Sequence, residues 1–399
     1  DPDTKILSSP LHINKREFNN RFCVHPMEGS DADENGAVTD LVTARYKKFA
    51  KGGSALIWFE AVSVVPEGRA SANQLLINEE NLDGFKKLIE TIKEEGLSAN
   101  GFEPVVIMQL THSGRFSKPD GKPLPLIAYH HSELDKKHNI ADDLECVTDE
   151  YIDTLPEKFA KAAALAQKAG FDGVDVKCCH RYLLHEFLSA FDRPGKYGGN
   201  YENRTRLLFD CVDAVNSEIG HNKILATRLN GFDALPDGFA CDKTDYMQPD
   251  LNESVQLAKD LKAKGMDVFN ITTGSPYYNS FVNRPNDVEK DEEPLLGVSR
   301  MFEVIGQIQK AVGSVPVVGT GFSYLRQFLP YAAAGEIKAG RCSMAGLGRM
   351  SLARPRYPKE IMNNVKVDPR LLCTTCGKCA GLLRAGGPSY CAVFNKDNL

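Results

Sequence analysis

The sequence lacks the features of a membrane-spanning, secreted or nucleic-acid-binding protein. It contains no run of about 18 apolar residues, so we expect no segment that crosses a membrane. Its formal net charge is −5, whereas a nucleic-acid-binding surface needs an excess of basic residues. The first 21 residues are polar and contain no apolar signal-peptide core. We therefore expect a cytoplasmic protein with neither a membrane nor a nucleic-acid partner.

Internal repeats and low-complexity segments are also absent from the sequence, whereas cysteine is plentiful. The chain has eleven cysteines, an odd number that does not suit a complete set of disulfides. Together with the missing secretory signal, this number predicts reduced thiols in a cytosolic compartment. Seven cysteines are scattered and four lie within the last 27 residues, so the second group is a candidate cofactor site.

Short apolar runs alternate with longer amphipathic segments along the chain. Strand-like runs occupy residues 21–25, 54–60, 104–110, 172–177, 223–229, 267–272, 315–320 and 341–346. Helix-like segments occupy residues 38–51, 80–96, 149–170, 202–219, 251–265, 299–312, 323–334 and 355–364. Strands that alternate with helices predict a parallel sheet, and eight such units favour closure into a (β/α)8 TIM barrel. No GxGxxG motif follows the first strand, which disfavours an open dinucleotide-binding sheet.

We expect the barrel to span residues 1–365 and a cysteine-bearing segment to occupy residues 366–399. Three segments that follow predicted strands are too long for simple connections, namely 111–148, 178–201 and 273–298. In a barrel, the loops that follow the strands gather at one face, where active sites lie. The alternative is that these loops only decorate the surface.

The cysteines near the C-terminus form the pattern C-x2-C-x2-C-x11-C, with Cys373, Cys376, Cys379 and Cys391 as its members. Thiolates bind both iron–sulfur clusters and zinc, so the spacing must discriminate between them. Zinc sites usually pair their cysteines in two separated C-x2-C units, whereas three cysteines in one tight run suit three corners of a cubane. The spacing therefore favours a [4Fe–4S] cluster, with zinc and free thiols as the alternatives.

Two glycine-containing motifs follow the last two predicted strands. They are GTGF (319–322) and GLGRMSLARP (346–355). A phosphate at the top of a barrel is expected near the last two strands, bound by loop amides and often by an arginine. The residues that suit this role are Gly319, Gly321, Gly348 and Arg349.

The order of the motifs resembles that of the Old Yellow Enzyme family of FMN-binding barrels. The segment DGVDVKCCHRYLLHEFLSAFDRPGKYGGNYENRTR (172–206) is similar to the DGVEIHGAHGYLLxxFLSP…YGGSxENR segment of that family. The match runs from residue 9 to Cys391 and is strongest with the branch that contains 2,4-dienoyl-CoA reductase and trimethylamine dehydrogenase. The resemblance implies a TIM barrel that binds FMN, followed by a segment that binds a [4Fe–4S] cluster.

The resemblance also implies roles for individual residues at the strand ends. Those that would line the flavin ring are Pro26, Met27, Glu28 and Ala61. Those that would hydrogen-bond its pyrimidine edge are Gln109 and Arg228, with Arg228 stabilising negative charge on the reduced ring. Those whose amides would bind the phosphate are Gly321, Phe322, Gly348 and Arg349.

The implied catalytic residues are Lys177, His180 and Tyr182. His180 matches the second member of the substrate-anchoring pair of the family, and Tyr182 matches the tyrosine that protonates the substrate in enone reductases. A hydride added to the β-carbon of an enone moves charge to the carbonyl oxygen, which donors stabilise while an acid supplies a proton. Two residues depart from the family. Lys177 stands where histidine is usual, and Glu28 stands where small or hydroxyl residues approach flavin N5.

These features predict an FMN-dependent reductase that acts on the activated C=C bond of a small unsaturated carbonyl compound. Two alternatives stay open: oxidative cleavage of a C–N or C–O bond, as in trimethylamine dehydrogenase, and a non-catalytic electron-carrier subunit. Larger relatives feed electrons to the cluster from a C-terminal nucleotide-binding region, whereas eight residues follow Cys391 here. Electrons would come from a partner protein through the cluster or directly from NAD(P)H, unless the chain is a shortened form. The sequence is compatible with a homo-oligomer.

Overall fold

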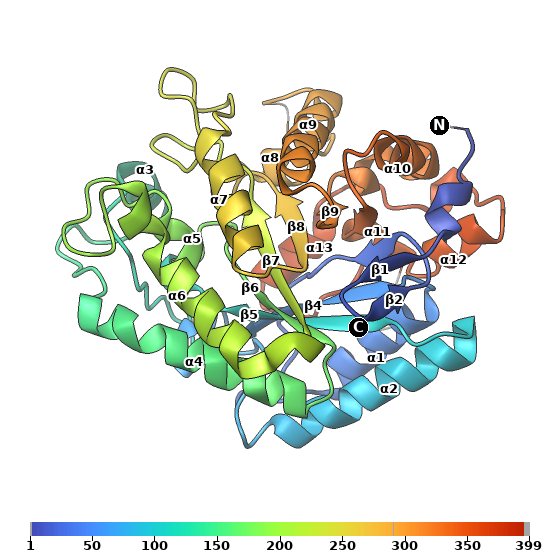
Figure 1. Cartoon of the computed structure of the whole chain (residues 1–399), viewed down its shortest axis with the longest axis horizontal. Helices are drawn as coiled ribbons and strands as arrows, with labels where there is room; N and C mark the ends of the chain where they lie inside the picture. The colour runs from blue at the N-terminus through green and yellow to red at the C-terminus, as the bar shows by residue number, and fades with distance from the viewer. Residues whose placement is uncertain (1, 290, 395–399) are drawn as a thin grey trace.

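The computed structural model describes residues 2–289 and 291–394 (Figure 1). Eight parallel strands close into a barrel in the order β10-β3-β4-β5-β6-β7-β8-β9. Their bounds are β3 (Phe22–Val24), β4 (Leu56–Ser63), β5 (Val105–Thr111), β6 (Gly173–Val176), β7 (Ile224–Asn230), β8 (Val268–Thr272), β9 (Val317–Gly319) and β10 (Met344–Leu347). Each strand overlaps one of the eight predicted runs, so the TIM barrel is confirmed. Part of the segment predicted at 366–399, residues 395–399, lies outside the described residues.

Helices surround the barrel, and the longest of them lie where the amphipathic segments predict them (Figure 1). Their bounds are α1 (Asp40–Lys51), α2 (Leu82–Asn100), α4 (Asp149–Lys168), α6 (Tyr201–Ile219), α7 (Asn252–Ala263), α9 (Pro294–Val312), α10 (Leu329–Lys338) and α12 (Tyr357–Met362). Side-chain caps fix the starts of α1, α4 and α6. Thr148 accepts a hydrogen bond from the Tyr151 amide at the start of α4, and Asn200 accepts one from the Asn203 amide at the start of α6.

One predicted helix has a different form. The segment 323–334 is a 3-10 stretch, η5 (Phe322–Phe328), that is followed by α10 rather than a single helix. Pro330 lies in the first turn of α10, where its missing N–H costs no hydrogen bond. The proline therefore starts a new helix instead of continuing the preceding turn.

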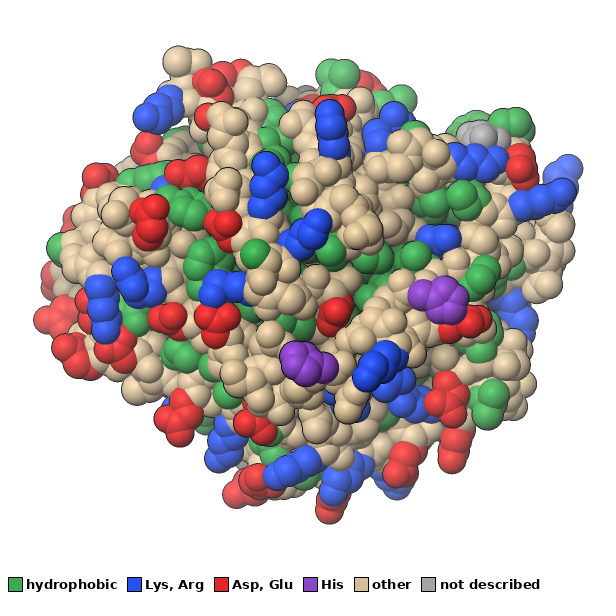
Figure 2. Space-filling view, viewed as in Figure 1, with side chains coloured by type: hydrophobic (Ala, Val, Ile, Leu, Met, Phe, Trp, Pro, Cys, Tyr) green, Lys and Arg blue, Asp and Glu red, His purple; other side chains and the backbone are tan. Residues whose placement is uncertain are grey.

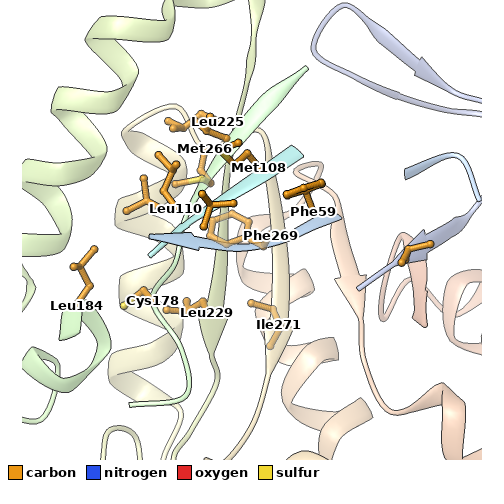
Figure 3. Packing of buried hydrophobic residues seen from close by; sticks show 14 of the residues in the cluster. Phe59, Met108, Leu110, Cys178, Leu184, Leu225, Leu229, Met266, Phe269 and Ile271 are labelled. Carbon is orange, nitrogen blue, oxygen red and sulfur yellow. The ribbon is translucent and has the colours of Figure 1, made fainter. Parts of the chain in front are cut away.

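Two apolar layers hold the barrel together. Alternate side chains of a strand point to opposite faces, so Leu56 and Trp58 of β4 pack inside the barrel, whereas Ile57 and Phe59 pack outside it. Figure 3 shows part of the outer layer, including Phe59 and Met108. The strands are buried on both faces, which is why their sequences are continuous apolar runs.

A short hairpin closes the end of the barrel at which the strands begin. Its strands are β1 (Leu11–Ile13) and β2 (Arg16–Phe18), which pair antiparallel. Ile13 and Phe18 belong to the interior apolar layer, and Asn14 hydrogen-bonds the carbonyl oxygen of Lys223 just before β7. β1 and β2 each bury only one of their three residues, so they leave no apolar run in the sequence and this hairpin is not predicted.

Short helices occupy the long loops and the C-terminal segment. Within the loops lie η3 (Gly114–Phe116), α3 (Ser132–His138), α5 (Leu183–Phe187) and α8 (Ser280–Asn283). The remaining short elements are η1 (Lys5–Ser8), η2 (Pro66–Gly68), η4 (Gly220–Asn222), α11 (Arg349–Ala353), η6 (Pro369–Leu371) and α13 (Lys378–Arg384). None of the helices that the structure describes is long and apolar enough to cross a membrane. On the face shown in Figure 2, acidic and basic side chains are intermingled.

Candidate active site at the carboxyl ends of the strands

A buried carboxylate organises the strand ends inside the barrel. The strand register places Ala61 beside Gln109 and Gln109 beside Asp175. Asp175 accepts hydrogen bonds from Gln109 Nε2 at 2.6 Å, from Trp58 Nε1 at 2.7 Å and from the Arg228 amide at 2.8 Å. Burial raises the pKa of Asp175 to about 6, although these donors oppose the shift. Asp175 thus orients Gln109 and fixes the strand that carries Arg228. The only sequence signal for it is an acidic residue within an apolar run.

Arg228, at the end of β7, is a buried cation whose guanidinium group lacks some of its possible hydrogen bonds. Arg228 is only 7% exposed, and its guanidinium donates a hydrogen bond to the carbonyl oxygen of Pro26 at 3.1 Å. Its Nε has no hydrogen-bond partner among the described residues. A buried charge without full hydrogen bonding is costly, so this site suits a ligand that accepts hydrogen bonds. Pro26 and Met27 follow β3, and Met27 Sδ lies beside Gly348 of the loop after β10.

The two loops predicted to bind phosphate come together. Gly321 has a left-handed backbone (φ 104°) that a side chain would strain, and it leads into η5. The Met350 amide of α11 donates a hydrogen bond to Ser323 Oγ at 3.3 Å, which ties the loop after β10 to the loop after β9. The Phe322 ring is fully buried against Phe302, so only its backbone can face a ligand.

Two arginines reinforce this end of the site with positive charge. Arg349 donates a hydrogen bond to the carbonyl oxygen of Pro285 at 2.9 Å. Burial, together with repulsion from Arg349 and Arg384, lowers the pKa of Arg284 to about 10. Within the described part of the chain, no carboxylate pairs with Arg284 or Arg349. Two neighbouring cations without an acidic partner suit a phosphate. No sequence motif marks Arg284, so its position here is not predicted from the sequence.

The chain turns sharply after β6, and this turn places the predicted catalytic residues. His180 and Arg181 both have left-handed backbones (φ 61° and 65°), which is unfavourable for residues with a side chain. The turn is held from several sides. The His180 amide donates to Asn230 Oδ1 at 3.2 Å, the Arg181 amide donates to His185 Nδ1 at 2.8 Å, and the Arg181 guanidinium donates to Asp233 at 3.1 Å. Backbone strain that surrounding residues maintain in this way is frequent at functional sites.

His180 is a neutral imidazole in this environment. Burial, reinforced by the charges of Arg228 and Lys177, lowers the pKa of His180 well below its usual value. Its Nε2 accepts a hydrogen bond from Asn283 Nδ2 at 3.0 Å, so the proton resides on Nδ1. Asn283, on α8, therefore sets the tautomer of His180. Asn283 is not predicted from the sequence, because it lies 103 residues from His180 in the chain and no motif links them.

Tyr182 lies at the centre of a buried polar group. Its hydroxyl donates to Glu28 Oε2 at 2.8 Å and lies 2.9 Å from the Tyr277 hydroxyl. Lys177 Nζ lies 3.8 Å from the same Glu28 oxygen and 3.5 Å from the centre of the Tyr182 ring. Phe116 stacks on Tyr277 with the ring centres 3.7 Å apart. Burial raises the pKa values of Tyr182 and Glu28 and lowers that of Lys177.

The four C-terminal cysteines lie beside the same end of the barrel. Cys373 is buried within the outer apolar layer, and Cys379 and Cys391 pack against it. Arg349 interacts electrostatically with Cys373, Cys376 and Cys379. Burial raises the pKa of Cys373 to about 11, and the charge of Arg349 opposes the shift. Among residues 2–289 and 291–394, no three histidine, cysteine, aspartate or glutamate side chains converge on a position for a single metal ion.

The structure therefore brings the predicted ring-lining, phosphate-binding and catalytic residues to one face of the barrel, with the cysteines close by. Active sites of this fold lie at this face, where loops from several strands meet. Together, the fold and its strand-end residues define a barrel enzyme.

Comparison with known proteins gives the class. The sequence profile of the NADH:flavin oxidoreductase / NADH oxidase family matches residues 7–368. The chain belongs to this family, which includes the Old Yellow Enzymes, and it is an FMN-dependent oxidoreductase. It is 30% identical over 366 residues to the NADPH dehydrogenase of Bacillus subtilis (strain 168), a match that covers 91% of this chain and 96% of that protein.

Two further proteins extend the comparison. The chain is 28% identical over 407 residues to a cinnamate reductase of Clostridium sporogenes, covering 98% of this chain and 57% of the relative. The solved structure of a 2-naphthoyl-CoA reductase in complex with 2-naphthoyl-CoA shares the fold, with a TM-score of 0.81 and 22% identity. That match covers 99% of this chain and 58% of the reductase, so the chain spans little more than half of either protein.

Proposed function

We propose that the protein reduces the activated C=C bond of a small unsaturated carbonyl compound. The observation that carries this proposal is the position of Tyr182 and His180. The Tyr182 hydroxyl and the His180 imidazole follow β6 at the same face as Arg228 and Gln109, and this position supports roles as an acid and a hydrogen-bond donor. The name of the clostridial relative, a cinnamate reductase, agrees with a substrate that contains a conjugated C=C bond.

FMN would be held along one side of the barrel mouth. Gln109 and Arg228 would bind the pyrimidine edge, and the unpartnered Arg228 Nε fits a group that accepts hydrogen bonds. The residues that would line the ring are Pro26, Met27, Glu28 and Ala61. The phosphate would bind the amides of Gly321, Phe322, Gly348 and Arg349, with Arg284 adding charge. When bound, FMN supplies the hydride for the reaction.

The protein residues would stabilise charge and supply the proton. When the β-carbon of the substrate gains hydride, negative charge develops on the carbonyl oxygen. Nδ1–H of His180 and the Lys177 ammonium are the donors that can face this oxygen. Tyr182 then transfers its phenolic proton to the α-carbon, because burial keeps the phenol protonated until that step. Excluding water from the site strengthens each of these interactions.

We propose that NAD(P)H reduces the flavin and that Cys373, Cys376, Cys379 and Cys391 bind a [4Fe–4S] cluster. The relationship to an NADPH dehydrogenase supports the first part. The second part rests on the C-x2-C-x2-C-x11-C spacing of these cysteines and on the proximity of Cys373 to Cys379 and Cys391, whose charges act on the Cys373 thiol. The cluster would exchange single electrons with a partner protein in the reducing cytoplasm.

The experiment that tests the function is an anaerobic reaction of the reduced holoenzyme. Photoreduced protein is mixed with an unsaturated ketone, an unsaturated aldehyde and an unsaturated carboxylate, and flavin absorbance is followed. We expect at least one of them to reoxidise the flavin and to yield the saturated product in a stoichiometric amount. If none of them does, whereas an amine reduces the oxidised flavin, the protein oxidises C–N bonds and the proposal fails.

The cluster assignment makes a separate prediction. The Cys379→Ser variant is expected to lose iron and acid-labile sulfide, which in the parent protein should be about four of each per chain. FMN content should persist, because the barrel residues hold the flavin. Cys146→Ser is the matched control: this half-buried cysteine lies outside the C-terminal group and should leave iron unchanged. Stoichiometric zinc in the parent protein would contradict the assignment.

A further inference from the structure

We propose that Glu28 reprotonates Tyr182 after each turnover, so that Glu28 and Tyr182 form a proton relay beside Tyr277. This inference rests on the proposed function of the site, in which Tyr182 gives its proton to the substrate. It assigns to Glu28 a role other than lining the flavin ring. Glu28 is a positioning residue in this scheme, because it acts on the substrate only through Tyr182.

The distances between the Tyr182 hydroxyl and its neighbours favour proton transfer to it from the Glu28 carboxyl. Tyr182 Oη lies 2.8 Å from Glu28 Oε2 and 2.9 Å from Tyr277 Oη, so both neighbours are within hydrogen-bond reach of the reacting oxygen. Stacking of Phe116 on Tyr277 fixes the position of the outer hydroxyl. Tyr182 is only 4% exposed, so a phenolate formed there has little access to water as a proton source.

The charges around Glu28 suit a group that gives up a proton and takes it back. The charged or titratable groups that face Glu28 are Lys177, Tyr182, Tyr277 and Cys179. Burial favours the neutral carboxyl and so raises the pKa of Glu28, whereas Lys177 at 3.8 Å stabilises the carboxylate. The carboxyl therefore holds a proton more readily than an exposed glutamate does, and its conjugate base has a cation beside it.

The proton balance of the cycle closes within these residues. The substrate gains hydride at its β-carbon and a proton at its α-carbon, where a C–H bond forms as the O–H bond of Tyr182 breaks. The resulting phenolate takes the proton of Glu28 across the 2.8 Å hydrogen bond. The carboxylate that remains pairs with the Lys177 ammonium until it regains a proton from solvent. Tyr277 donates a hydrogen bond to the phenolate and stabilises it before the transfer.

The test compares the first turnover with later ones in Glu28→Gln. The glutamine keeps the size and a hydrogen bond but has no transferable proton. Because Tyr182 starts protonated, the first reoxidation of the reduced flavin should slow much less than the later turnovers, although Glu28 would also line the flavin ring. Later turnovers should slow by about 10²-fold, the lower range for loss of acid–base catalysis. Asp260→Asn is the control, since it alters a similar pair, Tyr201 with Asp260 at 2.7 Å, on the outer helices and should change neither phase.

A second measurement tests, without turnover, whether Glu28 affects the ionisation of Tyr182. Ultraviolet difference titration follows phenol ionisation in the holoenzyme, with Glu28→Gln/Tyr182→Phe to identify the signal of Tyr182. The Glu28 charge and its hydrogen bond help to raise the pKa of Tyr182, so Tyr182 should ionise at lower pH in Glu28→Gln than in the parent. If Glu28→Gln does not retain FMN, Glu28→Ala with added acetate should recover the later turnovers.

Equal rates in both phases, or an unchanged phenol titration, would overturn the relay. A parent enzyme that reduces no unsaturated carbonyl compound would instead overturn the proposed function. In that case the titration still reports whether Glu28 and Tyr182 are coupled, so the two failures can be distinguished.

Discussion

Tyr182→Phe is expected to slow C=C reduction by about 10²- to 10⁴-fold, the range that a positioned general acid contributes. The phenylalanine fills the same buried space, so loss of the hydroxyl removes the proton donor without opening a cavity. Reduction of FMN by NAD(P)H does not use this proton, and its rate should stay unchanged. Stopped-flow absorbance of the two half-reactions separates the effects. Loss of the Tyr182 proton should slow the parent only in the alkaline range, because burial raises the pKa of Tyr182.

Tyr201→Phe is the matched control for this change. Tyr201 also donates a hydrogen bond to a carboxylate, that of Asp260, but it lies on α6 at the outside of the barrel. It should leave both half-reactions at the parent rate. If Tyr182→Phe reduces every accepted substrate as fast as the parent does, Tyr182 is not the acid. The barrel would then serve a different reaction or only electron transfer.

The strands of the barrel can be predicted from sequence because each is buried on both faces. Val105 to Met108 and Ile224 to Ala226 are apolar on both sides of the strand, so they stand out against the amphipathic helices. The hairpin that contains Ile13 and Phe18 does not stand out in this way. Its strands are three residues long, and only their packing into the barrel end reveals their role.

The residues of the candidate site also fall into two groups, those that can be predicted from the sequence and those that cannot. Residues that belong to a motif, such as His180 and Tyr182, can be located from the sequence because the motif fixes the spacing along one loop. The partners that set their protonation come from distant loops. Asn283 reaches His180 from α8, and Tyr277 reaches Tyr182 from the loop after β8. Their contacts depend on how the loops fold over the barrel, which local patterns do not encode.

The turn that carries His180 depends on a second buried network, centred on Asp233. Asp233 is fully buried and accepts hydrogen bonds from Asn230 Nδ2 at 2.9 Å, from Arg181 at 3.1 Å and from the Phe239 amide at 2.9 Å, and it pairs with His185 at 3.0 Å. Burial disfavours its charge, but His185 and Arg181 outweigh that effect and hold the pKa of Asp233 far below its usual value. The network holds the two consecutive left-handed residues in place.

Asp233→Ala should therefore destabilise the protein by about 3–5 kcal/mol, because it leaves the Arg181 charge buried without its partner. Denaturant unfolding followed by circular dichroism measures this loss.

A carboxyl whose folded-state pKa is depressed contributes stability above its unfolded pKa of about 4, and this stability is lost as the pH falls towards the folded-state value. The parent should thus lose stability in acid more steeply than the variant does. Asp83→Ala, which removes an exposed carboxylate paired with Lys86, should change stability little and keep the acid slope of the parent. Equal acid slopes for Asp233→Ala and the parent would show that Asp233 is not the charged centre of this network.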